Sequence, residues 1–101
     1  MKYKQYNVTP IFSTYEFGGN LAMYLEQDGN MIAVVTVNID EELTNEQCAF
    51  IDINNMSEDI CAWLEENEFG KFTGNIGFSG FCVYPEFEFD KQVIERYKKG
   101  E

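Results

Sequence analysis

The acidic side chains are the residues of this chain best suited to chemistry, and they far outnumber the basic ones. The sequence holds 18 Asp and Glu against 7 Lys and Arg, and the formal net charge is −11 at pH 7. Lys71 is the single basic residue between Gln5 and Asp90. A body this acidic repels nucleic acids and anionic membranes and attracts basic protein surfaces. The alternative interpretation is that the charge serves solubility or adaptation to high salt.

Two rows of carboxylates present this charge in an ordered way. In the strand row, Glu86, Glu88 and Asp90 alternate with Phe87 and Phe89, so a strand places the carboxylates on one face, about 6.6 Å apart. Such a row can substitute for phosphates in a basic groove, although a charged edge strand that discourages aggregation is the alternative. A predicted helix carries the helix row, and a predicted loop carries the loop group. Their members are Glu58, Asp59, Glu65, Glu66 and Glu68 in the helix row, and Asp40, Glu41 and Glu42 in the loop group.

Patterns typical of catalytic or metal sites are weak. Histidine is absent, which removes the usual general base and the commonest metal ligand. The three cysteines, Cys48, Cys61 and Cys82, form no C-x-x-C pair, and their odd number indicates reduced thiols. Carboxylates at 40–42 and at Asp52 are candidate cation ligands, but no calcium-loop pattern accompanies them, which favours solvated loops. We therefore expect no enzyme activity and no cofactor.

Residues 74–80 carry glycines at G-x-x-G-x-x-G spacing, which is a weak signal for phosphate binding. The segment lacks the Lys-Ser/Thr ending of a P-loop and leads into no clear helix. A flexible connection or a bulged, twisted strand is the favoured interpretation.

A single α+β domain over residues 1–101 is predicted to position these groups. Its hydrophobic content is 45%, which suits one folded core. Alternating and β-branched residues predict an antiparallel meander followed by further strands, to give a sheet of about five strands. The predicted strands are residues 11–17, 20–27, 31–38, 48–53 and the 81–90 region, with turns at Gly18-Gly19 and Asp28-Gly29-Asn30 and a loop at 40–47.

One amphipathic helix is predicted to pack across this sheet. It spans residues 57–67, with Ser57 as its N-cap and Gly70 as its stop. Its apolar stripe contains Ile60, Trp63 and Leu64. A short terminal helix is predicted within residues 91–99.

Five segments of the chain form a set with a specific order and spacing. They are residues 21–25 (LAMYL), 33–39 (AVVTVNI), 50–55 (FIDINN), 63–67 (WLEEN) and 79–85 (SGFCVYP). Together they resemble a family of small bacterial proteins, known only as a domain of unknown function and carried on conjugative elements and phages. The resemblance covers about residues 20–89 and supplies no catalytic residues. The T-V-N-L-P type segment common in that family lacks its proline in this chain, where Ile39-Asp40-Glu41-Glu42 stands instead.

Charge and resemblance together predict a non-enzymatic inhibitor of the anti-CRISPR or antirestriction kind. It would bind the basic nucleic-acid cleft of a bacterial defence nuclease as a nucleic-acid mimic, with Tyr or Phe anchors. The alternative is an accessory adaptor or protein-binding module of a mobile element with no defence target. Affinity that falls steeply with salt distinguishes the mimic from an apolar or strand-addition interface.

The expected location is the cytoplasm of a bacterial host cell. The first residues lead into no apolar segment of a signal peptide, and the longest apolar run, residues 31–35, has only the length of a strand. We expect no direct binding to nucleic acid or to a membrane.

Overall fold

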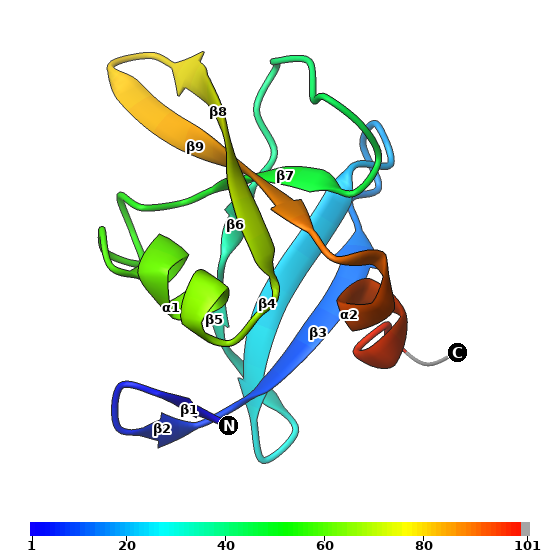
Figure 1. Ribbon diagram of the computed structural model, residues 1–101, viewed down its shortest axis with the longest axis vertical. Helices are drawn as coiled ribbons and strands as arrows, with labels where there is room; N and C mark the ends of the chain where they lie inside the picture. Colours follow the sequence, from blue (N-terminus) through cyan, green and yellow to red (C-terminus); the bar gives the residue numbers. More distant parts are fainter. Residues whose placement is uncertain (100–101) are drawn as a thin grey trace.

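Two antiparallel β-sheets and two short helices form an α+β fold (Figure 1). The computed structural model describes residues 1–99. The elements are β1 (Lys2–Tyr3), β2 (Tyr6–Asn7), β3 (Thr9–Thr14), β4 (Leu21–Gln27), β5 (Asn30–Val34), β6 (Thr36–Val37), β7 (Cys48–Ile51), α1 (Ile60–Glu66), β8 (Gly70–Ser79), β9 (Cys82–Phe89) and α2 (Lys91–Arg96). One sheet has the order β3-β4-β5, the other has the order β6-β7-β9-β8, and β1 and β2 form a separate hairpin. The predicted α+β class is confirmed.

The meander β3-β4-β5 follows the prediction because its turns carry residues that tolerate a left-handed backbone. Gly18 and Gly19 have φ of 81° and 69° in the first turn. Asp28 and Gly29 have φ of 52° and 81° in the two-residue turn that joins β4 to β5. Positive φ at both central positions is the type I′ geometry that tight hairpins favour. Alternate residues of β4 are buried, so this strand lies on the core.

The segment predicted as one strand over residues 31–38 is divided between the two sheets at Val35. The Val35 N–H donates to the Met23 carbonyl of β4 at 2.9 Å, and the Val35 carbonyl accepts from the Asp52 N–H at 2.9 Å. One residue therefore hydrogen-bonds to β4 on one side and to Asp52, the residue after β7, on the other. The strands after it build a second sheet, where the sequence predicted a single sheet of about five strands.

One core cluster joins both sheets and both helices. Phe87 and Phe89 of β9 are fully buried, and their ring centroids lie 4.9 Å apart. The ring of Phe12 in β3 packs edge-on against Phe89 at 5.1 Å. Ile60 and Leu64 are the buried residues of α1, as the predicted stripe requires. These contacts hold β9 against the meander.

The start and the end of α1 differ from the prediction. The helix begins at Ile60, and Asp59 occupies the N-cap position without a side-chain cap bond. Ser57 therefore lies before the N-cap, and its hydroxyl donates to the Asp59 carboxylate. Glu68, with φ of 60°, supplies the left-handed residue after the helix that was predicted at Gly70.

The C-terminal segment returns to the meander after α2. The Asp90 carboxylate caps this helix by accepting from the Gln92 N–H at 3.0 Å. Beyond the helix, the Phe12 N–H donates to the Tyr97 carbonyl at 2.9 Å, and the Lys99 N–H donates to the Phe12 carbonyl at 2.8 Å. The predicted short terminal helix is confirmed. No helix in residues 1–99 is long and apolar enough to cross a membrane.

Gly70 has a different role from the predicted one, because it allows β8 to approach β9 closely. A Cβ at this position would clash with the Glu88 carbonyl and lie 2.9 Å from the Phe89 Cα. Gly74 in the same strand also has positive φ, 97°, but a Cβ there would have no heavy atom within 4 Å.

We expect Gly70→Ala to lower the free energy of unfolding by about 1–3 kcal/mol more than Gly74→Ala, since both substitutions strain the backbone but only the first overpacks it. Urea titration followed by circular dichroism measures both values. Equal losses in the two variants would contradict the close approach of β8 and β9.

Candidate functional site

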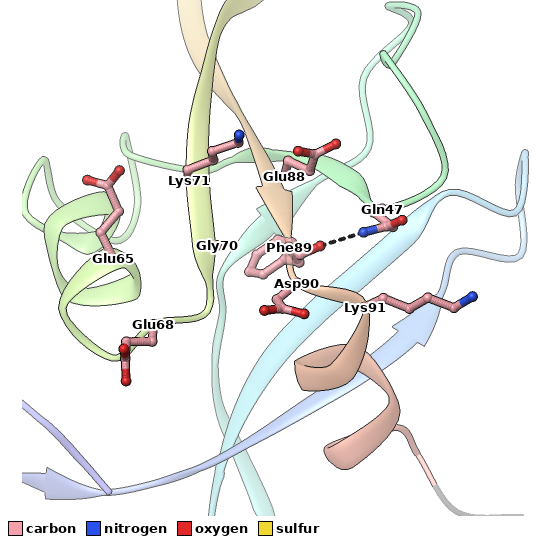
Figure 2. A pocket seen from close by; sticks show the side chains of 9 residues that line it. All are labelled: Gln47, Glu65, Glu68, Gly70, Lys71, Glu88, Phe89, Asp90 and Lys91. Carbon is pink, nitrogen blue, oxygen red and sulfur yellow. Dashed lines mark hydrogen bonds between the residues drawn. The ribbon is translucent and has the colours of Figure 1, made fainter.

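An open pocket lies where α1, β8 and the end of β9 meet, and carboxylates line much of it (Figure 2). Its volume is about 570 Å³. Glu65 lies on α1 and Glu68 in the turn after it, whereas Glu88 lies on β9 and Asp90 follows that strand. Figure 2 shows β8 running between these two acidic pairs. Parts of the helix row and the strand row therefore meet around one site, which we name the acidic pocket.

Two lysines and a glutamine complete the ionisable and polar lining of the acidic pocket. Lys71 of β8 is directly opposite Glu88 in the β8–β9 register. Lys91 is the first residue of α2, and Figure 2 shows its side chain extending away from the acidic pairs. The Gln47 side-chain amide donates to the Phe89 carbonyl at 3.0 Å. With four carboxylates and two amines among its lining residues, the pocket keeps an acidic character.

Glu86 lies outside this pocket and is buried, so the strand row that was predicted to bind a partner does not offer this carboxylate at the surface. Its side chain is only 1% exposed. The Thr44 N–H donates to Oε2 at 2.8 Å, and the hydroxyls of Thr44 and Thr73 donate to Oε1 at 2.7 and 2.6 Å. The Asn75 side-chain amide adds the fourth hydrogen bond to the carboxylate, which is the third to Oε1, at 3.2 Å. A buried carboxylate requires such donors because it has lost its hydrating water.

These donors reach Glu86 because β8 is bulged. The register shifts between Phe72 and Ile76, so residues 73–75 of β8 lie opposite Glu86 alone. The extra residues bring two donors to the carboxylate, while the loop before β7 brings Thr44. Of the two interpretations of the glycine-rich segment, a flexible connection or a bulged strand, the structure supports the bulged strand.

The same hydrogen bonds control the pKa of Glu86. Burial of the carboxyl group raises its pKa, but the hydrogen bonds from Thr73, Thr44 and Asn75 lower the pKa by a larger amount. The resulting pKa lies below the ordinary value of 4.5. Glu86 is therefore ionised at neutral pH, and its charge is enclosed by the fold.

The other predicted residues are exposed but lie apart from the acidic pocket. They are Glu58, Asp59 and Glu66 of the helix row, and Asp40, Glu41 and Glu42 of the loop group. Glu41 and Glu42 line a separate hollow with Gly18 and Gly19 of the β3–β4 turn. The acidic surface is thus divided, with one part at α1 and β9 and another at the loop.

Asp52 and Cys48 serve the fold. Asp52 is buried and accepts from the backbone N–H and the side-chain amide of Asn55 at 3.3 and 2.7 Å. Burial raises the pKa of Cys48 to about 11, which keeps the thiol protonated. Over residues 1–99, no three His, Cys, Asp or Glu side chains gather in a way that suits a metal ion.

The sequence interpretation missed an exposed apolar surface on the β8–β9 hairpin. Its large side chains are 42% to 108% exposed, and Figure 1 shows the hairpin end projecting away from both helices. These side chains are Phe72, Ile76, Phe78, Phe81 and Val83. A signal was present, because residues 72–85 form the longest stretch of the sequence without a charged residue.

A comparison with protein families identifies the family of this chain. The family model of DUF4313, a domain of unknown function, matches residues 11–101. The chain belongs to the DUF4313 family. The matched range contains the whole lining of the acidic pocket and the whole β8–β9 hairpin. No curated protein and no solved structure gives a significant match.

The enclosed carboxylate predicts a specific loss of stability. We expect Glu86→Gln to lower the free energy of unfolding at pH 7 by about 1.5–3 kcal/mol, because the amide nitrogen cannot accept the hydrogen bonds that the carboxylate accepts. Glu66→Gln is the matched control, since it removes the same charge from an exposed position of α1. Urea titrations of the three proteins measure the difference.

The pH dependence follows from the lowered pKa of Glu86. The folded state binds the Glu86 proton more weakly than the unfolded state, so ionised Glu86 stabilises the fold at pH values above its ordinary pKa of 4.5. This contribution is lost as the pH falls from 4.5 through the folded-state pKa. The difference in the free energy of unfolding between wild type and Glu86→Gln should therefore become smaller in acid. A difference that stays constant with pH would contradict the lowered pKa of Glu86.

Proposed function

We propose that this DUF4313 protein is a non-enzymatic inhibitor of the anti-CRISPR or antirestriction kind, carried by bacterial mobile elements. It binds the basic nucleic-acid cleft of a defence nuclease. The observation that carries the proposal is the acidic pocket, where Glu65, Glu68, Glu88 and Asp90 meet on a chain with a net charge of −11. A cleft built to bind phosphates attracts such a surface over a distance and speeds the encounter.

Two of the four pocket carboxylates are oriented before any partner arrives. Glu88 accepts from the Asn45 side-chain amide at 2.7 Å, and Asp90 accepts from the Gln92 N–H at 3.0 Å. Oriented anions lose less side-chain entropy on binding than free ones. The exposed Glu65 and Glu68 add charge beside them. In this mechanism the protein blocks the nuclease by occupying the Lys and Arg side chains that would hold nucleic acid.

The second candidate is an accessory adaptor or protein-binding module of a mobile element, with no defence target. The observation that favours it is the exposed apolar surface of the β8–β9 hairpin. Apolar interfaces depend little on salt, whereas contacts between exposed charges weaken as salt screens them. The salt dependence of affinity therefore separates the two candidates.

Charge reversal at the acidic pocket tests the inhibitor against a matched control. Glu65→Lys with Glu68→Lys reverses two pocket charges, and Glu41→Lys with Glu42→Lys makes the same change in the loop group. Plasmid cleavage by a panel of purified RNA-guided nucleases and restriction endonucleases is measured at several salt concentrations. We expect wild type and the loop variant to inhibit at least one nuclease. The pocket variant should require at least about tenfold more protein for the same inhibition of cleavage.

Three results would count against this mechanism. If the wild-type protein reduces cleavage by none of the nucleases in the panel, the proposed inhibitor function is wrong. Equal loss in the two variants shows that net charge matters and the acidic pocket does not. Inhibition that persists at high salt points to an apolar interface. Glu86 is left unchanged in this test, because a lysine there would bury a charge without a partner and unfold the protein.

A further inference from the structure

The distal part of the β8–β9 hairpin carries an ordered row of apolar side chains. Ile76 pairs with Pro85, and Phe78 pairs with Val83. Directly opposite residues of an antiparallel pair lie on the same face, so these four residues share one face of the hairpin. Ile76, Phe78 and Val83 are 48%, 60% and 42% exposed. We name Ile76, Phe78, Val83 and Pro85 the hairpin row.

The β8 strand is also the last strand of its sheet, so one side of its backbone has no neighbouring strand. The hairpin closes with a two-residue turn between Ser79 and Cys82. Gly80 at the first turn position has φ of 61°, as the type II′ turn requires. Bonded and non-bonded pairs alternate along an antiparallel ladder, starting here from the bonded closing pair. The next pair, which contains Phe78, is therefore non-bonded.

This alternation directs the backbone groups of Phe78 and Ile76 away from β9. Pro85 supports the assignment, because it has no N–H to donate and lies opposite Ile76, at a non-bonded position. Among residues 1–99, no other segment hydrogen-bonds the backbone of Ile76 or Phe78 on the outward side. The strand therefore has free donors and acceptors next to an apolar row.

The outer part of this edge, residues 76–79, lacks the charges, prolines and bulges by which proteins usually protect an exposed strand. Such protection comes from charged side chains, prolines on the edge or bulges. Residues 72–85 contain no charged side chain, and the bulge at 73–75 leaves residues 76–79 in regular pairing. An edge of this kind accepts a further strand, with main-chain hydrogen bonds for affinity and alternate side chains for specificity.

We propose that residues 76–79 of β8 bind an extended segment of a partner protein, which adds a strand to the four-stranded sheet. Alternate apolar side chains of that segment cover the hairpin row. Lys or Arg residues follow at the end of the segment that lies toward Gly70, because β8 leads there to Glu65 and Glu68 of the acidic pocket. This binding uses the hairpin row together with the charge of Glu65 and Glu68, and it does not require that the partner is a nuclease or that its cleavage is inhibited.

Charge complementarity selects this partner over a second copy of the chain. Each copy carries a net charge of −11, and two such bodies repel one another when their edges approach. A segment with basic residues meets the opposite charge, and its apolar residues meet a surface that has no charge to desolvate. The proposed occupant therefore combines an apolar alternation with a basic end.

Selection from a displayed library of random peptides tests the proposal with no nuclease present. We expect enrichment of peptides that alternate apolar residues and end in Lys or Arg. A synthetic peptide of the enriched sequence should protect the Ile76 and Phe78 amides from hydrogen exchange. Phe78→Ser should weaken its binding about tenfold or more, because the variant removes an anchor of the interface. Phe17→Ser should leave binding unchanged, since Phe17 is 88% exposed in the β3–β4 turn and is not part of the hairpin row.

Each of the other outcomes overturns the proposal. Enriched peptides that lack the alternation, or that bind Phe78→Ser as well as wild type, assign binding to another surface. A library that yields no enriched peptide removes the strand-acceptor site. A dimer in sedimentation experiments that Phe78→Ser dissociates makes the second copy the occupant. Circular dichroism confirms that the variants are folded, which is expected because both phenylalanines are largely exposed.

Discussion

A carboxylate that is removed from water must find hydrogen-bond donors inside the protein, and Glu86 imposes this requirement on three segments. One carboxylate oxygen accepts a hydrogen bond from the Thr44 N–H, and the other accepts hydrogen bonds from the side chains of Thr44, Thr73 and Asn75. A single charge thereby ties the loop before β7 to the bulge of β8 and to β9. The bulge separates the start of β8, which lies in the acidic pocket, from its regular outer part, which carries the hairpin row. Both candidate surfaces therefore depend on how this one anion is satisfied.

The sequence predicted the elements that adjacent residues determine. Gly18 and Gly19, and the pair Asp28 and Gly29, tolerate positive φ and so position the turns of the meander by themselves. The change of sheet at Val35 has no local signal, because it depends on hydrogen bonds to β4 and to the residue after β7. The start of α1 was mistaken for a related reason. Several capping residues stand together there, and their spacing alone does not show which of them lies at the N-cap.

The candidate site was also predicted only where adjacent residues determine it. Alternation along β9 correctly assigns Phe87 and Phe89 to the core, but it does not reveal whether the opposite face meets water. At Glu86 that face is covered by a loop and a bulge from other parts of the chain, whereas Glu88 is partly exposed. The meeting of Glu65 and Glu68 with Glu88 depends on the packing of α1 against β8. No spacing in the sequence encodes that contact.

The two surfaces differ in chemistry, yet both lie along β8 and suit successive stages of one binding event. Charges act over about a Debye length, so in the proposed complex the acidic pocket would attract the basic partner before contact and mainly set the association rate. Apolar side chains and strand pairing act only at contact, so the hairpin row mainly sets how slowly the partner leaves. An acidic body with an uncharged hairpin therefore combines attraction at a distance with retention at contact. Under the proposed binding, the coincidence of the exposed apolar hairpin with the longest uncharged segment of the chain has a functional reason.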